Sequence, residues 1–237
     1  MRIAVLGLGE AGSRLAADLA AAGVDVHGYD PLNGGSPEEA VAGSDVVLSV
    51  NSAKAALGAA RSAAPVLGEA LYADLNTASP ALKRELAEVA GARFADVALL
   101  GPVPAKGLGT PALASGPGAQ AFAAALEPLG MPVDVVSEQA GDAAAMKLLR
   151  SVFMKGLAAA AIESVEAAEA AGHVEWLKQE IAAVIGRPLL DRLLTGSRAH
   201  AVRRIDELEA AHALLEELGV EPRIAEASAG VLRGLGG

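Results

Sequence analysis

The sequence predicts an α/β fold, in which a parallel β-sheet domain over residues 1–138 is followed by an all-helical domain over residues 139–237. In the first part, short runs rich in β-branched residues alternate with alanine- and leucine-rich segments. That alternation is typical of parallel strands joined by helical crossovers. In the second part the strand-like runs stop, and helical segments follow one another with capping residues between them. The two patterns together predict two domains.

The composition is that of a globular protein with a large core. Hydrophobic residues make up 52% of the 237 residues and charged residues 20%,. The net charge of -10 argues against nucleic acid as a partner, because binding phosphates requires clustered Lys and Arg,. The chain has no cysteine and its four histidines lack the spacing of a zinc site, so we expect no metal,. It has no long apolar run and no convincing signal peptide, so we expect a soluble cytoplasmic protein with no membrane partner.

Five strand-like segments define the first domain. In chain order they are IAVLGLG, DVHGYD, DVVLSVN, LYADLN and RFADVALL, and a helical segment, SRLAADLAAAG, follows the first of them,. The first strand and this helix meet in a glycine-rich turn, VLGLGEAGSRLA.

That turn has the pattern of a dinucleotide-binding fingerprint. Gly7 permits a tight turn, Gly9 lets the backbone approach a pyrophosphate, and Gly12 lets helix and strand pack closely,. The helix start offers amide donors and a positive dipole to the phosphates. An ordinary glycine-rich turn is the alternative, but a strand before the glycines and a helix after them favour a Rossmann domain. The residues predicted to contact the cofactor here are Gly7, Leu8, Gly9, Glu10, Ala11 and Gly12.

Asp30, at the end of the second strand, favours NAD over NADP. Its carboxylate can accept hydrogen bonds from the adenosine ribose hydroxyls and would repel a 2′-phosphate. The following residues, PLNGGSPEEA, contain no Arg or Lys to bind such a phosphate. Because an Asp at a strand end can also simply cap a turn, NADP remains the alternative cofactor.

Four segments, taken in order, resemble the β-hydroxyacid dehydrogenases, relatives of 6-phosphogluconate dehydrogenase. They are IAVLGLGEAGSRLAADLAAAG, ADLNTASP, ADVALLGPVPAKGLGTPALASG and GDAAAMKLLRS, and they cover the dinucleotide domain and the start of the helical domain. The resemblance implies hydride transfer between a nicotinamide cofactor and a small anionic hydroxy acid, in a homodimer whose helical domains contact each other. Asn51 and Asn76, which follow two of the strands, are assigned to the cofactor, and Gly101, Pro102 and Val103 to the substrate.

The same resemblance makes Lys147 the catalytic acid/base. A hydride moving at carbon must be matched by a proton moving on the attached oxygen, and a lysine can move it near neutral pH if burial lowers its pKa. Ala143, Ala144 and Leu148 are the expected apolar neighbours. The alternative is a lysine that reaches solvent from the edge of a helix.

The chain departs from the family at the predicted substrate site. Leu100 stands where the family has a serine, and Arg150 and Ser151 stand where it has paired asparagines. Ser151 shares a helix face with Lys147, and we expect it to orient the reacting hydroxyl, with Arg150 binding an anion. The alternatives are a solvated arginine and a serine bonded back to its own helical turn. We also expect the amides of Gly101, Val103 and Ala105 to form an anion-binding nest.

In the helical domain we expect a helix of about thirty residues from Gly141 to near Gly172, which is too long for one such domain to cover and therefore favours a homodimer over a monomer,. Ser197 is predicted to cap a later helix that Gly219 ends, and Pro222 to begin the next. The reserve candidates for binding a substrate anion are His200, Arg203 and Arg204, with Arg203 also expected to pair with Glu207,.

The sequence therefore predicts an NAD(P)-dependent oxidoreductase of the hydroxyacid dehydrogenase kind. Two alternatives stay open. An imine reductase shares the fold, but often has Asp or Tyr where this chain has Lys147. A cofactor-binding protein without catalysis would explain the departures at the substrate site.

Overall fold

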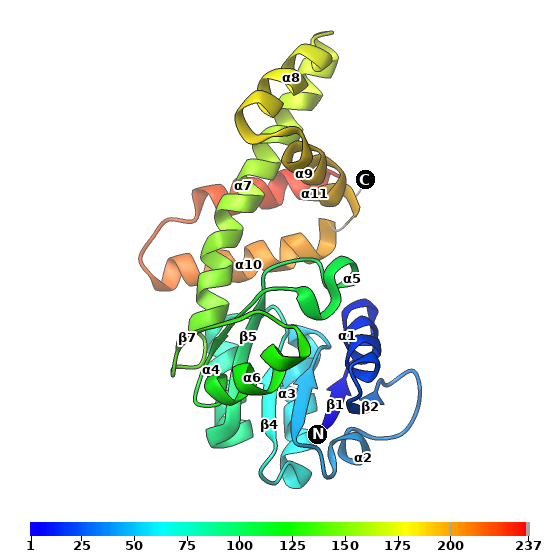
Figure 1. Cartoon of the computed structure of the whole chain (residues 1–237). Helices are drawn as coiled ribbons and strands as arrows, with labels where there is room; N and C mark the ends of the chain where they lie inside the picture. Colours follow the sequence, from blue (N-terminus) through cyan, green and yellow to red (C-terminus); the bar gives the residue numbers. More distant parts are fainter. Residues whose placement is uncertain (200, 236–237) are drawn as a thin grey trace. The chain divides into compact units, whose positions relative to one another are not determined.

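The computed structural model describes residues 1–199 and 201–235, and the chain divides into two compact units, Met1–Lys147 and Leu148–Gly237 (Figure 1). The division falls later than the expected boundary at residue 138. The first turns of the long helix that follows are bound to the sheet of the first unit: the amides of Gly141 and Ala144 donate to the Asp96 carboxylate, at 3.2 and 3.0 Å.

The first unit is built around a seven-stranded sheet with the order β2-β1-β3-β4-β5-β6-β7. All five predicted strands are present, and two further strands follow them. The strands are β1 Arg2–Leu6, β2 Asp25–Tyr29, β3 Val46–Ser49, β4 Leu71–Asp74, β5 Phe94–Leu99, β6 Ala112–Ser115 and β7 Val133–Ser137. Because β1 pairs with both β2 and β3, the strand order reverses beside β1, which is where open α/β sheets bind ligands,.

Two strands correct the expectation of a parallel sheet, because β7 pairs parallel to β6 and both run opposite to β1–β5. Strand β6 runs antiparallel to β5, with Leu99 opposite Ala112. The connection between them contains only the four-residue helix α5 (Val103–Lys106) and a short 3-10 turn, Gly107–Gly109. A four-residue helix rises only about 6 Å, whereas β5 spans about 20 Å, so the connection is too short to cross back to the start of β5. Strand β6 therefore begins at the end of the sheet where β5 finishes, and it runs in the opposite direction.

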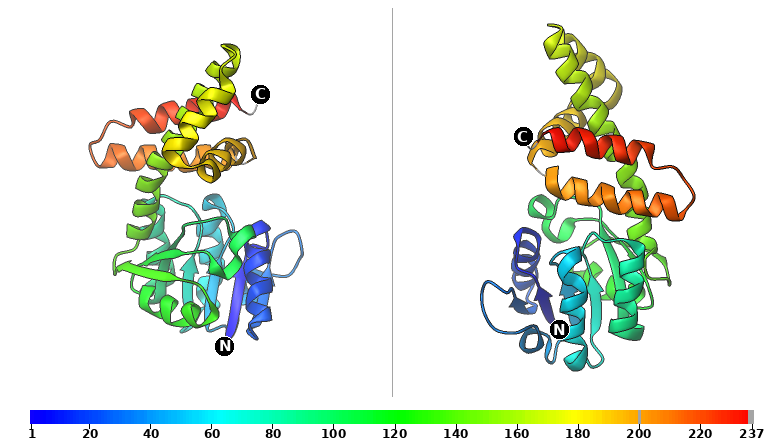
Figure 2. Two further views of the ribbon diagram at one scale, coloured as in Figure 1. Left: turned by 45° about the horizontal axis from the view of Figure 1, so that its top comes forward. Right: turned by 180° about the vertical axis from the view of Figure 1, so that it is seen from behind.

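Helices cover both faces of this sheet (Figure 2). They are α1 Glu10–Ala21, α2 Pro37–Val41, α3 Ala53–Ala63, α4 Pro80–Ala90 and α6 Ala119–Leu126, in addition to α5. Successive residues of a strand point to opposite faces. Ile3 and Val5 therefore enter the core under α1 and α6, while Ala4 and Leu6 enter the core under α2, α3 and α4. Burial on both faces explains the nearly continuous apolar strands.

The second unit is all-helical, as predicted. Its helices are α7 Asp142–Ala170, which begins in the first unit, and then α8 Val174–Ile185, α9 Arg187–Ala199, α10 Ala201–Glu217 and α11 Arg223–Gly234. Helix α7 has 29 residues, which confirms the expected long helix. Helices α10 and α11 lie side by side, and their core with α7 contains Ile162, Leu208 and Leu232 (Figure 2). In the described ranges, no helix has the length and apolar character needed to cross a membrane.

The predicted helix ends in this unit are only partly correct. Ser197 does not cap a helix: it lies inside α9, where its Oγ donates to the carbonyl of Leu193 at 2.6 Å,. Gly219, with φ +71°, does follow the end of α10, as expected. Pro222 immediately precedes the first residue of α11. His200 lies outside the described residues.

Candidate functional site

The glycine fingerprint has the geometry that its sequence predicts. Gly7 has φ +103°, and a Cβ there would lie 2.5 Å from the carbonyl oxygen of Val50. A Cβ on Gly12 would lie 1.8 Å from the carbonyl oxygen of Gly7. A Cβ on Gly9, by contrast, would meet no atom within 4 Å, so open space lies before the start of α1. No side chain caps that helix start. The turn can therefore admit a phosphate close to its backbone.

Asp30 is fixed at the end of β2 by two backbone amides. Leu8 donates to its Oδ2 at 2.9 Å and Leu32 to its Oδ1 at 3.0 Å. These hydrogen bonds, from Leu32 first and Leu8 second, lower the pKa of the carboxyl group, so it is ionised at neutral pH,. Each carboxylate oxygen retains lone-pair capacity for a ribose hydroxyl. The fingerprint and Asp30 are thus joined directly, through Leu8.

A cavity of about 510 Å³ lies at the carboxyl ends of β1, β2 and β3. Its lining includes Gly7, Gly9, Asp30 and Asn51, which are four of the residues assigned to the cofactor. Another wall is formed by small residues of α3, namely Ala55, Gly58 and Ala59. The position beside the reversal of strand order, the open glycine turn and the anionic Asp30 together suit the adenosine and pyrophosphate parts of a dinucleotide.

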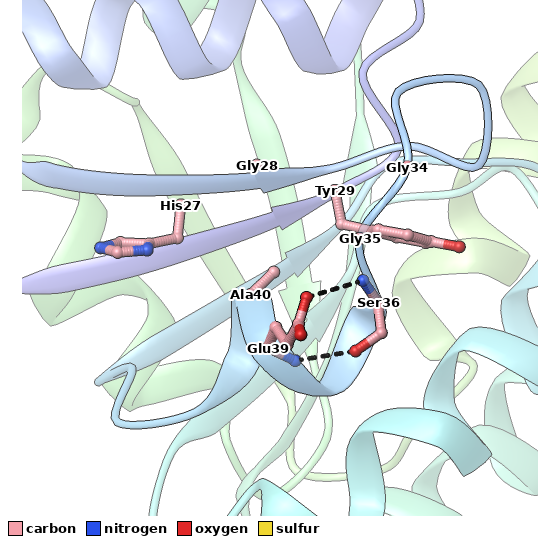
Figure 3. A pocket seen from close by; sticks show the side chains of 8 residues that line it. All are labelled: His27, Gly28, Tyr29, Gly34, Gly35, Ser36, Glu39 and Ala40. Carbon is pink, nitrogen blue, oxygen red and sulfur yellow. Dashed lines mark hydrogen bonds between the residues drawn. The ribbon is translucent and has the colours of Figure 1, made fainter.

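A smaller cavity, of about 210 Å³, lies between β2 and α2 (Figure 3). Its polar lining is already engaged. The Ser36 amide donates to the Glu39 carboxylate and the Glu39 amide donates to Ser36 Oγ, both at 3.2 Å, in a capping box that begins α2,. His27, also in the lining, lies 3.1 Å from the carboxylate of Asp25. These contacts serve local structure, and we assign this cavity no ligand.

Lys147 lies at the carboxyl edge of the sheet, where the resemblance places the reacting groups. It is half-buried, and its Nζ donates to Thr77 Oγ1 at 2.7 Å. Thr77 belongs to the loop that follows β4. On the preceding turn of α7, Ala143 and Ala144 are buried. The lysine is therefore held against the sheet domain by a specific hydrogen bond.

Asn51 and Asn76 come together at the same edge. The amide nitrogen of Asn76 donates to Asp74 Oδ2 at 2.6 Å, to Asn51 Oδ1 at 3.0 Å and to Ser49 Oγ at 3.2 Å. Asn51 lines the larger cavity, whereas Asn76 is buried and its amide nitrogen is engaged by protein groups. Asn76 thus links the loop that carries Thr77 to the sheet beneath it.

The predicted substrate loop folds into α5 and is tied to α1. Pro102 precedes this short helix, and the amide of Ala105 donates to the Pro102 carbonyl at 3.2 Å, so this amide is not free to join the expected anion nest. Val103 is buried in the core, and Gly101 lies half-buried beside it. Two hydrogen bonds form the tie to α1: Leu108 N donates to Asp18 Oδ2 at 3.0 Å, and Arg14 donates to the carbonyl of Pro104 at 2.9 Å.

A buried lysine that was not predicted as a site residue lies beneath the carboxyl edge of the sheet. Lys83 in α4 is fully buried, with its Nζ 2.6 Å from Asp74 Oδ1 and 3.1 Å from Asp96 Oδ1. Burial acts to lower the pKa of Lys83, but the two carboxylates outweigh it and raise the pKa,. Two sequence signals could have identified the cluster: a lysine in register with Pro80 and Leu86 on the buried face of α4, and aspartates inside apolar strands.

In the second unit, Ser151 forms part of a different cluster. It is buried, and its Oγ donates to Glu207 Oε1 at 2.6 Å rather than to its own helical turn. Lys155 Nζ lies 2.7 Å from Glu207 Oε2 and 3.2 Å from Ser151 Oγ. Burial lowers the pKa of Lys155, while Glu207 opposes that shift. Arg150 and Arg203 are exposed, and Arg204 donates to Ser197 Oγ.

In the parts of the chain that the structure describes, no three His, Asp or Glu side chains are grouped so as to hold a metal ion.

Comparison with family models and curated proteins gives relatives without an assigned activity. Residues 168–235 match a family described as "Domain of unknown function (DUF1932)". An uncharacterized 28.5 kDa protein from Methanothermus fervidus is 28% identical over 175 residues, which cover 72% of this chain and 68% of that protein.

Solved structures extend the likeness to nearly the whole chain. A conserved protein of unknown function, itself described as structurally similar to 3-hydroxyacid dehydrogenases, is 28% identical with a TM-score of 0.79, covering 99% of this chain and 96% of that one. The 3-hydroxyisobutyrate dehydrogenase of Mycobacterium tuberculosis is 21% identical with a TM-score of 0.80, over 98% and 92% of the two chains. An imine reductase of Streptomyces aurantiacus has a lower TM-score, 0.58, at 21% identity over 99% and 93%. The predicted resemblance to hydroxyacid dehydrogenases, with a Rossmann domain followed by a helical domain, is confirmed.

Proposed function

We propose that this protein is an NAD(P)-dependent oxidoreductase that transfers a hydride between the nicotinamide and a small anionic hydroxy acid or its carbonyl partner, with Lys147 as the acid/base. The observation that carries the proposal is the placement of Lys147 Nζ, 2.7 Å from Thr77 Oγ1, at the sheet edge that also holds the glycine fingerprint. The likeness to hydroxyacid dehydrogenases supports the same class of reaction.

The residues of the first unit fit a dinucleotide. The turn from Gly7 to Gly12 would hold the pyrophosphate, because its backbone is open in front of Gly9,. Asp30 would accept hydrogen bonds from the adenosine ribose hydroxyls,. When bound, the nicotinamide supplies or accepts the hydride.

Lys147 would hold and move the proton on the substrate oxygen. In the oxidation direction a neutral amine at Nζ accepts the hydroxyl proton, and in reduction the ammonium donates a proton to the developing alkoxide. The hydrogen bond to Thr77 Oγ1 fixes the direction of the side chain, which limits the freedom that must be lost in the transition state,.

The direct test compares Lys147→Ala and Lys147→Arg with the wild type. Fluorescence titration with NADH and NADPH measures cofactor binding. Turnover is then measured with a panel of small hydroxy acids, phosphorylated analogues, semialdehydes and cyclic imines. We expect both variants to bind cofactor like the wild type and to lose at least about a hundredfold in kcat, since an arginine keeps the charge but does not release its proton.

Arg187→Ala, which removes an exposed arginine of α9 that pairs with Asp191, is the control and should keep full activity. If Lys147→Ala turns over as fast as the wild type, the proposed acid/base role is wrong. If the wild type binds cofactor but turns over nothing in the panel, the protein is a cofactor-binding protein instead. Turnover of cyclic imines alone would make it an imine reductase.

For the cofactor, we propose that NAD is preferred over NADP. The support is Asp30, an anionic carboxylate held by two amides at the end of β2, where it would repel a 2′-phosphate,. The wild type should bind NADH more tightly than NADPH. Asp30→Asn should lower the ratio of the NADPH and NADH dissociation constants, because it weakens NADH binding and removes the repulsion of the 2′-phosphate. Tighter binding of NADPH by the wild type would contradict the preference.

The substrate-binding roles of Gly101, Pro102, Val103, Arg150 and Ser151 remain part of the proposal. Arg150 is exposed and can reach an anion in solvent, whereas Ser151 is already bound to Glu207. We therefore expect Arg150→Ala to raise KM for anionic substrates, and Ser151→Ala to act mainly through the Glu207 and Lys155 cluster.

We also propose that the chain forms a homodimer through its helical unit. Helix α8 contributes no fully buried residue, and its Trp176 and Val184 side chains are 62% and 84% exposed. Phe153 on α7 is 68% exposed. Light scattering on the wild type should give the mass of a dimer, and Trp176→Glu together with Phe153→Glu should convert it to a monomer. A monomeric wild type would contradict the proposal.

A further inference from the structure

The buried cluster around Lys83 connects two segments of the proposed active site. Lys83 Nζ lies 2.6 Å from Asp74 Oδ1 and 3.1 Å from Asp96 Oδ1, and it also donates to the main-chain carbonyl of Asp74 at 2.8 Å. All three side chains are fully buried. Lys83 is in α4, Asp74 ends β4, and Asp96 is in β5. One cation thus lies between two carboxylates that come from neighbouring strands.

The Asp74 side of the cluster leads to the loop after β4. Its second oxygen, Oδ2, accepts a 2.6 Å hydrogen bond from the amide of Asn76. The next residue, Thr77, accepts the hydrogen bond from Lys147 Nζ. Asp74 therefore fixes the segment that Lys147 contacts.

The Asp96 side leads to the start of the helix that carries Lys147. Asp96 Oδ2 accepts from the amides of Gly141 and Ala144, at 3.2 and 3.0 Å, and from Ser115 Oγ at 3.1 Å. Ser115 Oγ in turn accepts from the amide of Ala143, at 3.0 Å. The amides of Ala143 and Ala144 belong to the first turn of α7 and have no partner within the helix itself, and Gly141 immediately precedes that turn,. A carboxylate of the sheet thus caps α7.

Close packing restricts the same helix start to one backbone path. Gly141 has φ +103°, and a Cβ on it would lie 2.9 Å from the carbonyl oxygen of Pro80, the first residue of α4. Helix α4, which carries Lys83, is therefore in contact with the residue that precedes α7.

We propose that Lys83 is a positioning residue for Lys147: by bridging Asp74 and Asp96 it fixes the start of α7 relative to the loop of Asn76 and Thr77, and so sets where the Lys147 amine lies. The inference rests on the proposed function for its catalytic consequence, but not for its structural one. Lys83 touches neither substrate nor cofactor in this role. It acts through the two carboxylates, whose orientation depends on the cation between them.

Hydrogen exchange tests the structural part without any activity. In Lys83→Met the two carboxylates are no longer bridged, and Asp96 loses the group that orients it toward α7. We expect the amides of Ala143 and Ala144 to exchange at least about tenfold faster than in the wild type, under conditions where the variant stays folded. Leu86→Ala is the matched control, because Leu86 is a fully buried residue of the same helix that is not part of the cluster.

Kinetics tests the catalytic part. We expect Lys83→Met to lower kcat about tenfold or more with the best substrate. KM and the dissociation constant of NADH should change less than about threefold, because the cavity proposed for the cofactor lies at β1, β2 and β3 and not at the Lys83 cluster,. Leu86→Ala should leave kcat within about threefold of the wild type when both are folded. Equal losses of kcat in the two variants would show that Lys83 only stabilises the fold.

A second variant covers the case in which Lys83→Met does not fold. Ser115→Ala removes the hydroxyl that donates to Asp96 Oδ2 and accepts from Ala143, and we expect it to speed exchange in the first turn of α7 and lower kcat severalfold. Unchanged exchange in every folded variant overturns the inference. A wild type without turnover refutes the proposed function instead, while the exchange data still decide whether the cluster positions α7.

Discussion

The two units each contain a buried lysine bound to carboxylate, and the two lysines behave in opposite ways. Lys83 in the sheet unit is fully buried between two aspartates, and its pKa is raised. Lys155 in the helical unit, with 13% of its side chain exposed, faces Glu207, and its pKa is lowered. Burial alone would lower the pKa of both amines.

The surrounding charges account for the difference. Two carboxylates act on Lys83, and together they outweigh the cost of burial. Burial dominates at Lys155, since the attraction of Glu207 is partly offset by repulsion from Arg204 and Arg150. Lys83 therefore keeps its proton more firmly than an ordinary lysine, whereas Lys155 loses its proton more readily,. A lysine's role in this protein is set by its charged neighbours more than by its depth.

The largest expected effect is on the sheet unit. Lys83→Met leaves Asp74 and Asp96 buried together without a cation, and breaking a buried ion pair in this way costs about 3–5 kcal/mol,. Urea unfolding followed by circular dichroism measures the loss. A cost below about 1 kcal/mol would mean that the fold does not require the Lys83 cation.

The equivalent change in the helical unit should cost less. Lys155→Met leaves Glu207 with the hydrogen bond from Ser151 Oγ and partial access to water, so we expect a loss of about 1–2 kcal/mol,. The same unfolding experiment measures it. An equal loss of stability in Lys155→Met and Lys83→Met would contradict the view that the sheet unit depends more on its buried lysine.

The two lysines should also differ in how stability depends on pH. The pKa of Lys155 is lower in the folded protein than in the unfolded chain, so just below the ordinary lysine pKa the unfolded chain binds more protons,. The free energy of unfolding therefore rises with pH in that window, by up to about 1.4 kcal/mol for each pH unit. The contribution of Lys83, whose folded pKa is raised, is fully present below the ordinary lysine value and is lost only as pH rises beyond it,.

Unfolding free energies at about pH 7 and about pH 9.5 test this difference. The wild type should gain stability over Lys155→Met as the pH rises, while its advantage over Lys83→Met should stay constant. The opposite pattern would reverse the assignment of the two lysines.

The smallest effect is expected at an exposed ion pair. Arg187 and Asp191 lie 3.0 Å apart in α9, but their side chains are 61% and 55% exposed. Arg187→Ala should change stability by no more than about 0.5 kcal/mol, because water and salt screen the pair. If Arg187→Ala lowered the unfolding free energy as much as Lys155→Met does, solvent exposure would not be what determines the strength of these ion pairs.

The sequence alone was sufficient for local features. The spacing of the glycines at 7, 9 and 12 and the five apolar strands follow from patterns that are visible within short segments, and the structure has these features as predicted,. The reversed direction of β6 and β7 was missed because it depends on how far the connection through α5 can reach, which periodicity does not show. The capping role given to Ser197 was wrong, because a serine inside a helix can bond to the preceding turn just as well,.

The candidate site likewise has some features that follow from the sequence and others that only the tertiary structure shows. The sequence by itself determined that Lys147 follows a glycine at a helix start and that Asn76 follows a strand. Only the tertiary structure decided that Thr77 receives the Lys147 amine, and that Lys83 joins Asp74 to Asp96 beneath it. These contacts join residues far apart in the chain, and their formation depends on which strands are neighbours. The physical reason is that a buried charge is stable only beside its partner, and packing of the whole sheet is what brings the two together.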